Sequence, residues 1–277
     1  MKNITVNILL LILFQSSALA VQAKEAEICF VANAGFYAQD GEKGILLDAL
    51  FADGLKGYHI ASAPVRTELE NASGKFKNVR MIFVSHFHDD HMKGEPIIKH
   101  IRANPDVKAI MPEQAKEKVI DAGVSADETQ SVLGNTLKIG TQHQLLDMPF
   151  PTTLYGISHG EGRSIENIGI MVEVAGQTIM HVGDMDAKAE DLKKAGIDGL
   201  KVDWLLMPSW YLDNKNNANF IASAFDARNI IPMHFVLDDN DWIKSQGGMV
   251  RYKEKVYHSL PNITKLETEM SCLPLNN

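Results

Sequence analysis

One run of seven residues, holding three histidines and two aspartates, constrains this chain more than any other stretch: Ser85-His86-Phe87-His88-Asp89-Asp90-His91. The run directly follows residues 79–84, an apolar and β-branched segment that predicts a buried strand. The polar cluster is therefore expected at the C-terminal end of a strand. Open α/β sheets bind their ligands at that end of the sheet, so the run predicts a functional site.

The spacing within this run suits metal binding. His86 and His88 are two residues apart, so in extended backbone both imidazoles project to the same side and can reach one metal ion. Asp90 and His91 lie past the turn and can serve a second ion nearby. Imidazoles and carboxylates are the usual ligands of zinc, and they also suit iron or manganese. The alternative is a polar surface loop with chance histidines, which the other candidate ligands later in the chain argue against.

The segment from His86 to His91 resembles the His-x-His-x-Asp-His motif of the metallo-β-lactamase-fold hydrolase superfamily. The family's remaining motifs are single residues, and each finds a matching position. His159 follows the middle strands, Asp184 ends a predicted strand, and His234 follows a late strand. All seven motif positions are thus filled in order. The first motif is highly specific, whereas the single-residue motifs convince only as a set.

The resemblance implies an α/β (α+β) fold, a four-layer αβ/βα sandwich in which residues 24–277 form a single domain. It also implies two divalent metal ions, with zinc expected and iron or manganese as alternatives. The implied ligands are His86, His88 and His159 for the first ion, Asp90, His91 and His234 for the second, and Asp184 as the bridge. A hydroxide held between two such ions can cleave an ester, lactone, amide or phosphoester bond. Asp90 is the expected catalytic residue, because it can orient that hydroxide and accept its proton.

Asp184, the implied bridging aspartate, helps to decide which branch of the superfamily the chain resembles. True metallo-β-lactamases lack it, and many use a cysteine ligand in its place. The stretches around Asn167 and Asp184 look more similar to ascorbate-6-phosphate lactonases and related hydrolases. Two alternatives stay open: a periplasmic β-lactamase, and a metal-binding protein of the same fold without hydrolytic turnover, such as an iron redox protein or a binding component.

Charge and composition limit the partners. The formal net charge is −8 and no basic run is present, which argues against nucleic acid as a partner. A hydrophobic content of 45% and a charged content of 22% are ordinary for a soluble globular protein. The expected partner is therefore a small-molecule substrate.

The first 23 residues have the pattern of a secretory signal peptide. Lys2 is a short positive region, residues 4–14 are mostly apolar, and small residues follow in Ala-x-Ala-like cleavage sites ending at Ala20 and Ala23. The apolar run is too short to span a bilayer, so no stable membrane insertion of the mature chain is expected. The expected location is periplasmic or secreted. In such an oxidising space Cys29 and Cys272 can form one disulfide, with two free buried thiols as the alternative.

Alternating apolar patterns and turn signals predict the elements of an α/β chain. The expected strands cover residues 28–31, 45–48, 79–84, 107–111, 136–139, 144–148, 153–157, 168–174, 178–182, 202–207 and 230–234. The expected helices cover residues 67–73, 96–103, 112–122, 187–195, 217–227 and 242–258, the last interrupted at Gly247-Gly248.

Four other polar residues have two readings each. Asp48 ends a strand and is either a turn carboxylate or a group that orients a metal-bound histidine. His181 is expected to be structural or to orient a ligand rather than to bind metal itself, and His59 to be structural or exposed, although residues 50–64 border the site in similar proteins. Arg163 follows His159 in a loop that can line a substrate pocket, with a solvated charge as the favoured alternative.

Overall fold

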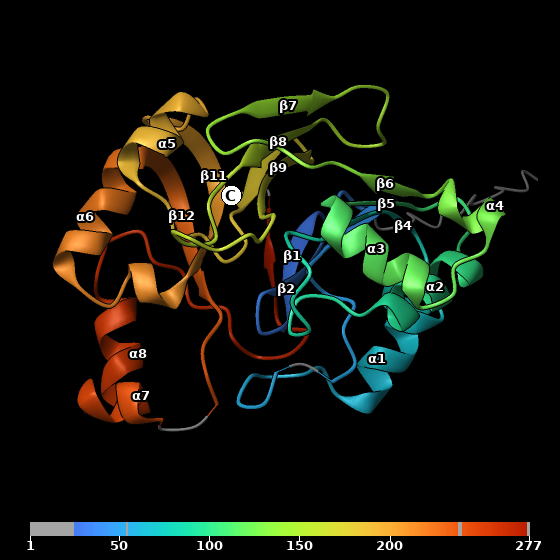
Figure 1. Ribbon diagram of the computed structural model, residues 1–277. Coiled ribbons are helices and arrows are strands. Elements are labelled where there is room, and N and C mark those ends of the chain that lie inside the picture. Colours follow the sequence, from blue (N-terminus) through green and yellow to red (C-terminus); the bar gives the residue numbers. More distant parts are fainter. Residues whose placement is uncertain (1–24, 54, 238–239, 276–277) are drawn as a thin grey trace, which may run out of the picture.

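The computed structural model describes residues 25–53, 55–237 and 240–275. They form two β-sheets packed face to face with helices on the outer faces (Figure 1). This four-layer arrangement confirms the predicted α/β fold and αβ/βα sandwich. The predicted signal peptide, residues 1–23, lies outside the described residues. Within the described ranges no helix is both long and apolar enough to cross a membrane.

The first sheet has seven strands in the order β13-β1-β2-β3-β4-β5-β6. Its strands are β1 (Glu27–Ala32), β2 (Gly35–Gln39), β3 (Gly44–Leu47), β4 (Val79–Phe83), β5 (Lys108–Met111), β6 (Val132–Gly134) and β13 (Cys272–Pro274). Strands β1 to β3 pair antiparallel, whereas β3 to β6 pair parallel. Cys29 on β1 lies opposite Cys272 on β13, and the two form a disulfide, the first of the two alternatives that the sequence left open.

The second sheet has six strands in the order β12-β11-β10-β9-β8-β7. Its strands are β7 (Gln142–Leu145), β8 (Thr152–Gly156), β9 (Ile168–Val174), β10 (Gln177–His181), β11 (Leu200–Pro208) and β12 (Phe225–Met233). Strands β7 to β10 pair antiparallel, and β10 to β12 pair parallel. In consequence β8, β10 and β12 all run in one direction and end at the same edge.

Helices cover the outer faces of both sheets (Figure 1). The first half of the chain contributes α1 (Ala63–Glu70), α2 (Gly94–Ala103), α3 (Glu113–Asp121) and α4 (Ala126–Thr129). The second half contributes α5 (Ala189–Lys194), α6 (Lys215–Ala224), α7 (Asp241–Ser245) and α8 (Met249–Tyr257). Two short 3₁₀ turns span Gly74–Phe76 and Ser209–Tyr211. The Ser125–Glu128 capping box starts α4, and the Asn214 side chain accepts from Asn217 N at the start of α6.

The first sheet is buried on both faces, which explains its continuous apolar strands. Along β3, Ile45 and Leu47 pack into the core between the sheets, while Leu46 packs into a second core under the helices. The inter-sheet core also contains Phe83 from β4 and Leu205 from β11. Each such fully buried side chain stabilises the fold by about 2 kcal/mol. This packing fixes the edge at which the strands of the two sheets end together.

Several predicted boundaries are wrong for identifiable reasons. Residues 136–139 are not a strand; they cross from β6 at the edge of the first sheet to β7 at the edge of the second. The helix predicted over 217–227 ends at Ala224, because the residues that follow pair in parallel with β11, beginning with Phe225 opposite Leu200. The helix predicted over 242–258 is two helices, α7 and α8, because Gly247 and Gly248 have positive φ.

Candidate metal centre

All seven predicted ligands lie just beyond strand ends at one edge of the sandwich. The run from His86 to His91 follows β4, and His159 follows β8. Asp184 follows β10, and His234 follows β12 directly. Because β4 in one sheet and β8, β10 and β12 in the other end at the same edge, residues far apart in sequence meet there.

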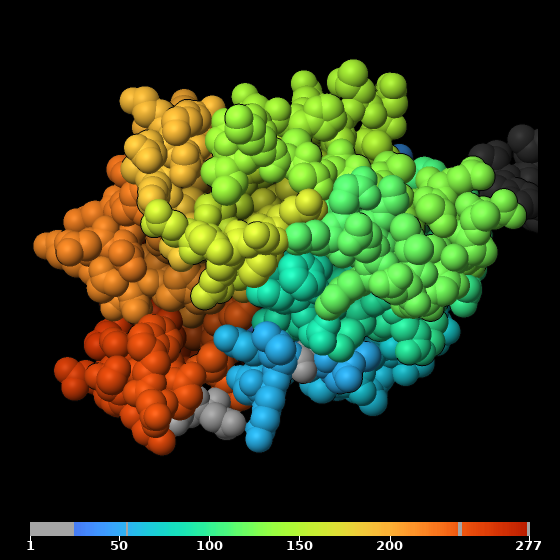
Figure 2. Space-filling model, in the orientation of Figure 1, coloured from blue at the N-terminus to red at the C-terminus, as the bar shows by residue number. Residues whose placement is uncertain are grey.

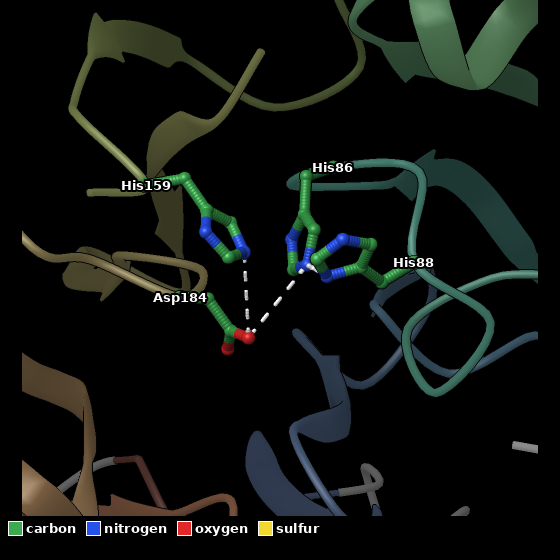
Figure 3. Close-up of side chains that lie close together, drawn as sticks. All are labelled: His86, His88, His159 and Asp184. Carbon is green, nitrogen blue, oxygen red and sulfur yellow. Dashed lines mark hydrogen bonds and ion pairs between the residues drawn. The ribbon is translucent and has the colours of Figure 1, made fainter. Parts of the chain in front are cut away.

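The first cluster consists of His86, His88, His159 and Asp184, whose potential ligand atoms all lie within 4.8 Å of one another. Figure 3 shows their side chains converging from both sheets. His86 Nε2 lies 3.0 Å from His88 Nδ1, and Asp184 Oδ2 lies 3.7 Å from His86 Nε2 and 3.6 Å from His159 Nε2. Nitrogen ligands of a tetrahedral zinc ion lie roughly 3.4 Å apart. The cluster thus has the spacing of one coordination shell.

The second cluster consists of Asp90, His91 and His234, all buried. His234 Nε2 lies 3.0 Å from Asp90 Oδ2 and 3.1 Å from His91 Nε2. Asp184 reaches this cluster too, with Oδ1 3.2 Å from His91 Nε2 and 3.3 Å from His234 Nε2. One carboxylate oxygen of Asp184 therefore faces each cluster.

Two histidines are oriented from behind by Asp48 and Ser85. His91 Nδ1 lies 2.7 Å from Asp48 Oδ2, and His86 Nδ1 lies 2.9 Å from Ser85 Oγ. Asp48 also accepts hydrogen bonds from the Ser85 amide and hydroxyl. These contacts leave the Nε2 atoms of both rings facing the clusters. Of the two readings of Asp48, the contacts support the one that orients a histidine.

Unpartnered buried atoms show that the seven residues fit a metal group. Asp90 Oδ1, Asp184 Oδ1 and both ring nitrogens of His159 are buried without a hydrogen-bond partner. Buried polar atoms rarely stay unpaired, because losing water without a replacement partner is costly. A donor set of imidazoles and carboxylates, gathered in two clusters that share Asp184, fits a pair of divalent cations.

The charges in the site point the same way. Burial lowers the pKa of His86 well below its ordinary value, with help from His91, so this ring is neutral and able to bind a metal. Burial acts against the charged form of His234 as well, yet Asp184 and Asp90 raise its pKa to about 9. Burial likewise opposes ionisation of Asp184, but His234 and His91 hold its pKa well below the usual range. The buried carboxylates thus favour positive charge beside them, and a metal ion that binds here must displace the protons held by the histidines.

The backbone is strained around the site. Asn33, Asp48 and His234 have φ values of 48°, 45° and 62°, which residues other than glycine rarely adopt. Such conformations cost about 1–3 kcal/mol each and persist where the surrounding fold imposes them. Gly183, just before Asp184, has φ of 61°, and a Cβ there would lie 2.1 Å from Asn167 Oδ1. Only glycine fits this turn.

Besides the seven predicted ligands, the sequence singled out His181 and Arg163, and the structure shows the contacts of each. His181 is buried and uses both nitrogens, with Nε2 2.8 Å from Ala34 O and Nδ1 accepting from Gly183 N, which matches the structural role expected of it. Arg163 is exposed and makes no ion pair among the described residues, as a solvated charge would.

One functional residue was missed from the sequence. Asn33 Nδ2 donates to the backbone oxygen and to Oδ2 of Asp90, and the Asn33 carbonyl accepts from His234 N. Asn33 therefore connects β1 to the second cluster. Its place at the end of a strand, before Ala34-Gly35, fits this role and a turn equally well, so the sequence held no specific signal for it.

This fold and paired histidine–aspartate clusters define a dimetal-binding class of proteins. The family model described as "Beta-lactamase superfamily domain" matches residues 43–235, and the chain belongs to this family. No curated protein matches the sequence.

Solved structures similar to this chain share its fold at low sequence identity. Igni18, a metallo hydrolase from Ignicoccus hospitalis, is 16% identical, with a TM-score of 0.57 over 90% of this chain and 98% of that one. The metallo-beta-lactamase fold protein YhfI from Bacillus subtilis is 11% identical, with a TM-score of 0.59 over 90% and 99%. CmlA, a diiron beta-hydroxylase from Streptomyces venezuelae, is 13% identical, with a TM-score of 0.51 over 91% and 54%. At these identities the similarity concerns the fold alone.

Proposed function

We propose that this protein is a dinuclear metal-dependent hydrolase that cleaves an ester, lactone, amide or phosphoester bond of a small molecule. The observation that carries the proposal is the position of Asp184. Its Oδ2 faces the histidines of the first cluster and its Oδ1 faces those of the second. This is the position of a carboxylate that bridges two cations and offsets their mutual repulsion.

The proposed ligands of the first ion are His86, His88 and His159, and those of the second are Asp90, His91 and His234. Asp184 contributes one oxygen to each side. Zinc is the expected metal, and iron or manganese would accept the same donors. When bound, the ions would supply Lewis acidity and make water nucleophilic near neutral pH.

Asp90 is the proposed catalytic residue. Its Oδ2 is held by Asn33 Nδ2 at 3.2 Å and lies 3.0 Å from His234 Nε2, whereas its Oδ1 is buried without a partner. One oxygen is therefore committed to the site's framework and the other is free to accept a proton from the attacking water. Asn33 restricts rotation of the carboxylate and so fixes the position of the free oxygen.

The decisive experiment combines elemental analysis with a substrate panel. The purified protein should carry close to two transition-metal ions per chain, most of them zinc. It should turn over at least one member of a panel of chromogenic esters, lactones, phosphodiesters and a cephalosporin, and a chelator should abolish the activity. Protein that stays metal-free under conditions that load other such enzymes would contradict the ligand assignment.

The same panel addresses the alternative functions. Turnover of the cephalosporin alone would favour a β-lactamase over a lactonase-like hydrolase. Two bound irons without turnover on any substrate would favour a redox or binding protein, whose metals the same imidazoles and carboxylates would accept. The complete ligand set supports an enzyme over a protein without turnover, and Asp184 in the bridging position supports a lactonase-like hydrolase over a β-lactamase.

We also propose that the protein acts outside the cytoplasm. The disulfide between Cys29 and Cys272 supports this, because such bonds persist in oxidising compartments. Mass spectrometry of the exported protein should find a mature N-terminus after Ala20 or Ala23; an intact Met1 would contradict the proposal.

A further inference from the structure

An aromatic ring from outside the ligand motifs packs directly on the second cluster. Tyr58 lies edge-on against His234, with ring centroids 4.5 Å apart and an interplanar angle of 71°. Trp210 packs against the same imidazole at 5.1 Å and 77°. His234 is thus held between two aromatic rings, of which only Tyr58 carries a hydroxyl.

The backbone fixes the position of Tyr58. The residue forms an antiparallel bridge with Val236, and Leu237 N donates to Gly57 O at 2.6 Å. This joins the loop after β3 to the segment that follows His234. Figure 2 shows the loop, in light blue, projecting at the surface beside the orange C-terminal part of the chain. The ring is therefore positioned by two segments, one of which carries a predicted metal ligand.

The Tyr58 hydroxyl does not contribute a hydrogen bond to the described part of the fold. Its oxygen is not fully buried, so it is accessible to solvent. Two other tyrosine hydroxyls in the second half of the chain are hydrogen-bonded within the fold: Tyr211 accepts from Ala187 N, and Tyr252 donates to Ser209 Oγ. A half-buried phenol with a free hydroxyl beside a proposed metal site is available to a ligand.

We propose that the Tyr58 hydroxyl contacts the substrate at the Asp90–His91–His234 side of the centre, where it donates a hydrogen bond to the carbonyl or phosphoryl oxygen. The inference rests on the proposed function and adds a residue to it. A tyrosine phenol has an ordinary pKa of about 10, so it carries its proton near neutral pH and can donate it toward an oxygen that gains negative charge. A fixed donor of this kind stabilises the charge that develops on that oxygen during hydrolysis.

The test compares Tyr58→Phe with wild type as the metal-loaded, full-length protein. Phenylalanine keeps the ring against His234 and removes only the hydroxyl. On the best panel substrate kcat should fall roughly 10- to 100-fold with little change in KM, because the hydrogen bond strengthens as charge develops. Metal content and Tm should match those of wild type. Tyr155→Phe is the control, since that hydroxyl lies on β8 and approaches only Met171 Sδ, at 3.9 Å.

A second readout does not depend on turnover. Phenylphosphonate, a tetrahedral oxyanion, should bind the zinc-loaded wild type in calorimetry, and its Kd should rise about 10-fold in Tyr58→Phe. Wild-type turnover with unchanged kcat and Kd in Tyr58→Phe would overturn the role of Tyr58 and leave the hydrolase proposal standing. Phosphonate binding that depends on Tyr58, without turnover of any substrate, would uphold Tyr58 as a ligand contact and count against the hydrolase. Loss of metal or a lowered Tm in Tyr58→Phe would show a structural role and overturn the proposal, as would wild-type protein that binds no phosphonate.

Discussion

Replacing Asp184 with Asn tests the proposed two-metal site most directly. The substitution keeps the shape of the side chain and removes one negative charge. Asp184 oxygens lie 3.2–3.7 Å from the Nε2 atoms of four histidines, which surround the positions that cations would occupy. A unit charge at such a distance is worth about 5 kcal/mol at an effective dielectric constant of about 20. Since 1.4 kcal/mol is a factor of ten, affinity for the second ion should fall by roughly 10³- to 10⁴-fold.

The assay is metal stoichiometry after gel filtration, together with turnover on the best panel substrate. Asp184→Asn should retain at most one ion and lose several orders of magnitude in kcat. The matched control is Asp89→Asn, in the same motif. Asp89 points away from both clusters, toward Lys118 at 2.7 Å and Lys93 at 2.8 Å, and these half-exposed pairs contribute at most about 1 kcal/mol each. If Asp184→Asn keeps two ions and near-normal turnover, or if Asp89→Asn is the more damaging, the ligand assignment is wrong.

Three further predictions concern groups around the centre. Asp48→Asn should weaken metal binding about 10- to 100-fold by equilibrium dialysis, because His91 loses the carboxylate that orients it; unchanged affinity would reject that role. Replacing Cys29 and Cys272 with alanine opens a disulfide spanning 243 residues and should lower unfolding free energy by about 2–5 kcal/mol in urea, with metal content unchanged. Burial opposes ionisation of Glu267, but Lys253 and Lys265 lower its pKa to about 2. The stabilisation that its carboxylate provides is therefore complete above about pH 4.5 and is lost as pH falls toward 2. Glu267→Gln should remove this pH-dependent part, less than about 1 kcal/mol, from the free energy of unfolding measured as a function of pH.

The ligand set could be predicted because the run from His86 to His91 resembles a specific family motif, and the single residues that complete the family pattern each follow a predicted strand. The strands before His86 and His234 are apolar, and they end at one edge of the sandwich. Asn33 and Tyr58 could not be assigned, because their roles exist only through contacts with residues 57 and more than 170 positions away. Nothing local distinguishes an asparagine that holds a catalytic carboxylate from one that forms a turn.

The misplaced elements have the same origin. Residues 136–139 contain threonine, leucine and isoleucine and suit a strand, yet they pass between the sheets where no neighbouring strand is available among the described residues. The helix prediction extends to residue 227, yet parallel pairing with β11 makes residues 225–227 strand. In both places the sheet partner decides the outcome, and local propensity is overridden.

The centre is largely assembled by the protein itself. Asp48 and Ser85 fix two histidine rings through their Nδ1 atoms, Asn33 fixes Asp90, and the positive φ values of Asn33, Asp48 and His234 are imposed by the buried strands that precede them. The core between the sheets consists of apolar side chains, so the fold should survive both chelation and the Asp184→Asn substitution. The loss of activity expected in that variant would then report the missing charge rather than a missing structure, which is what makes the comparison with Asp89→Asn decisive.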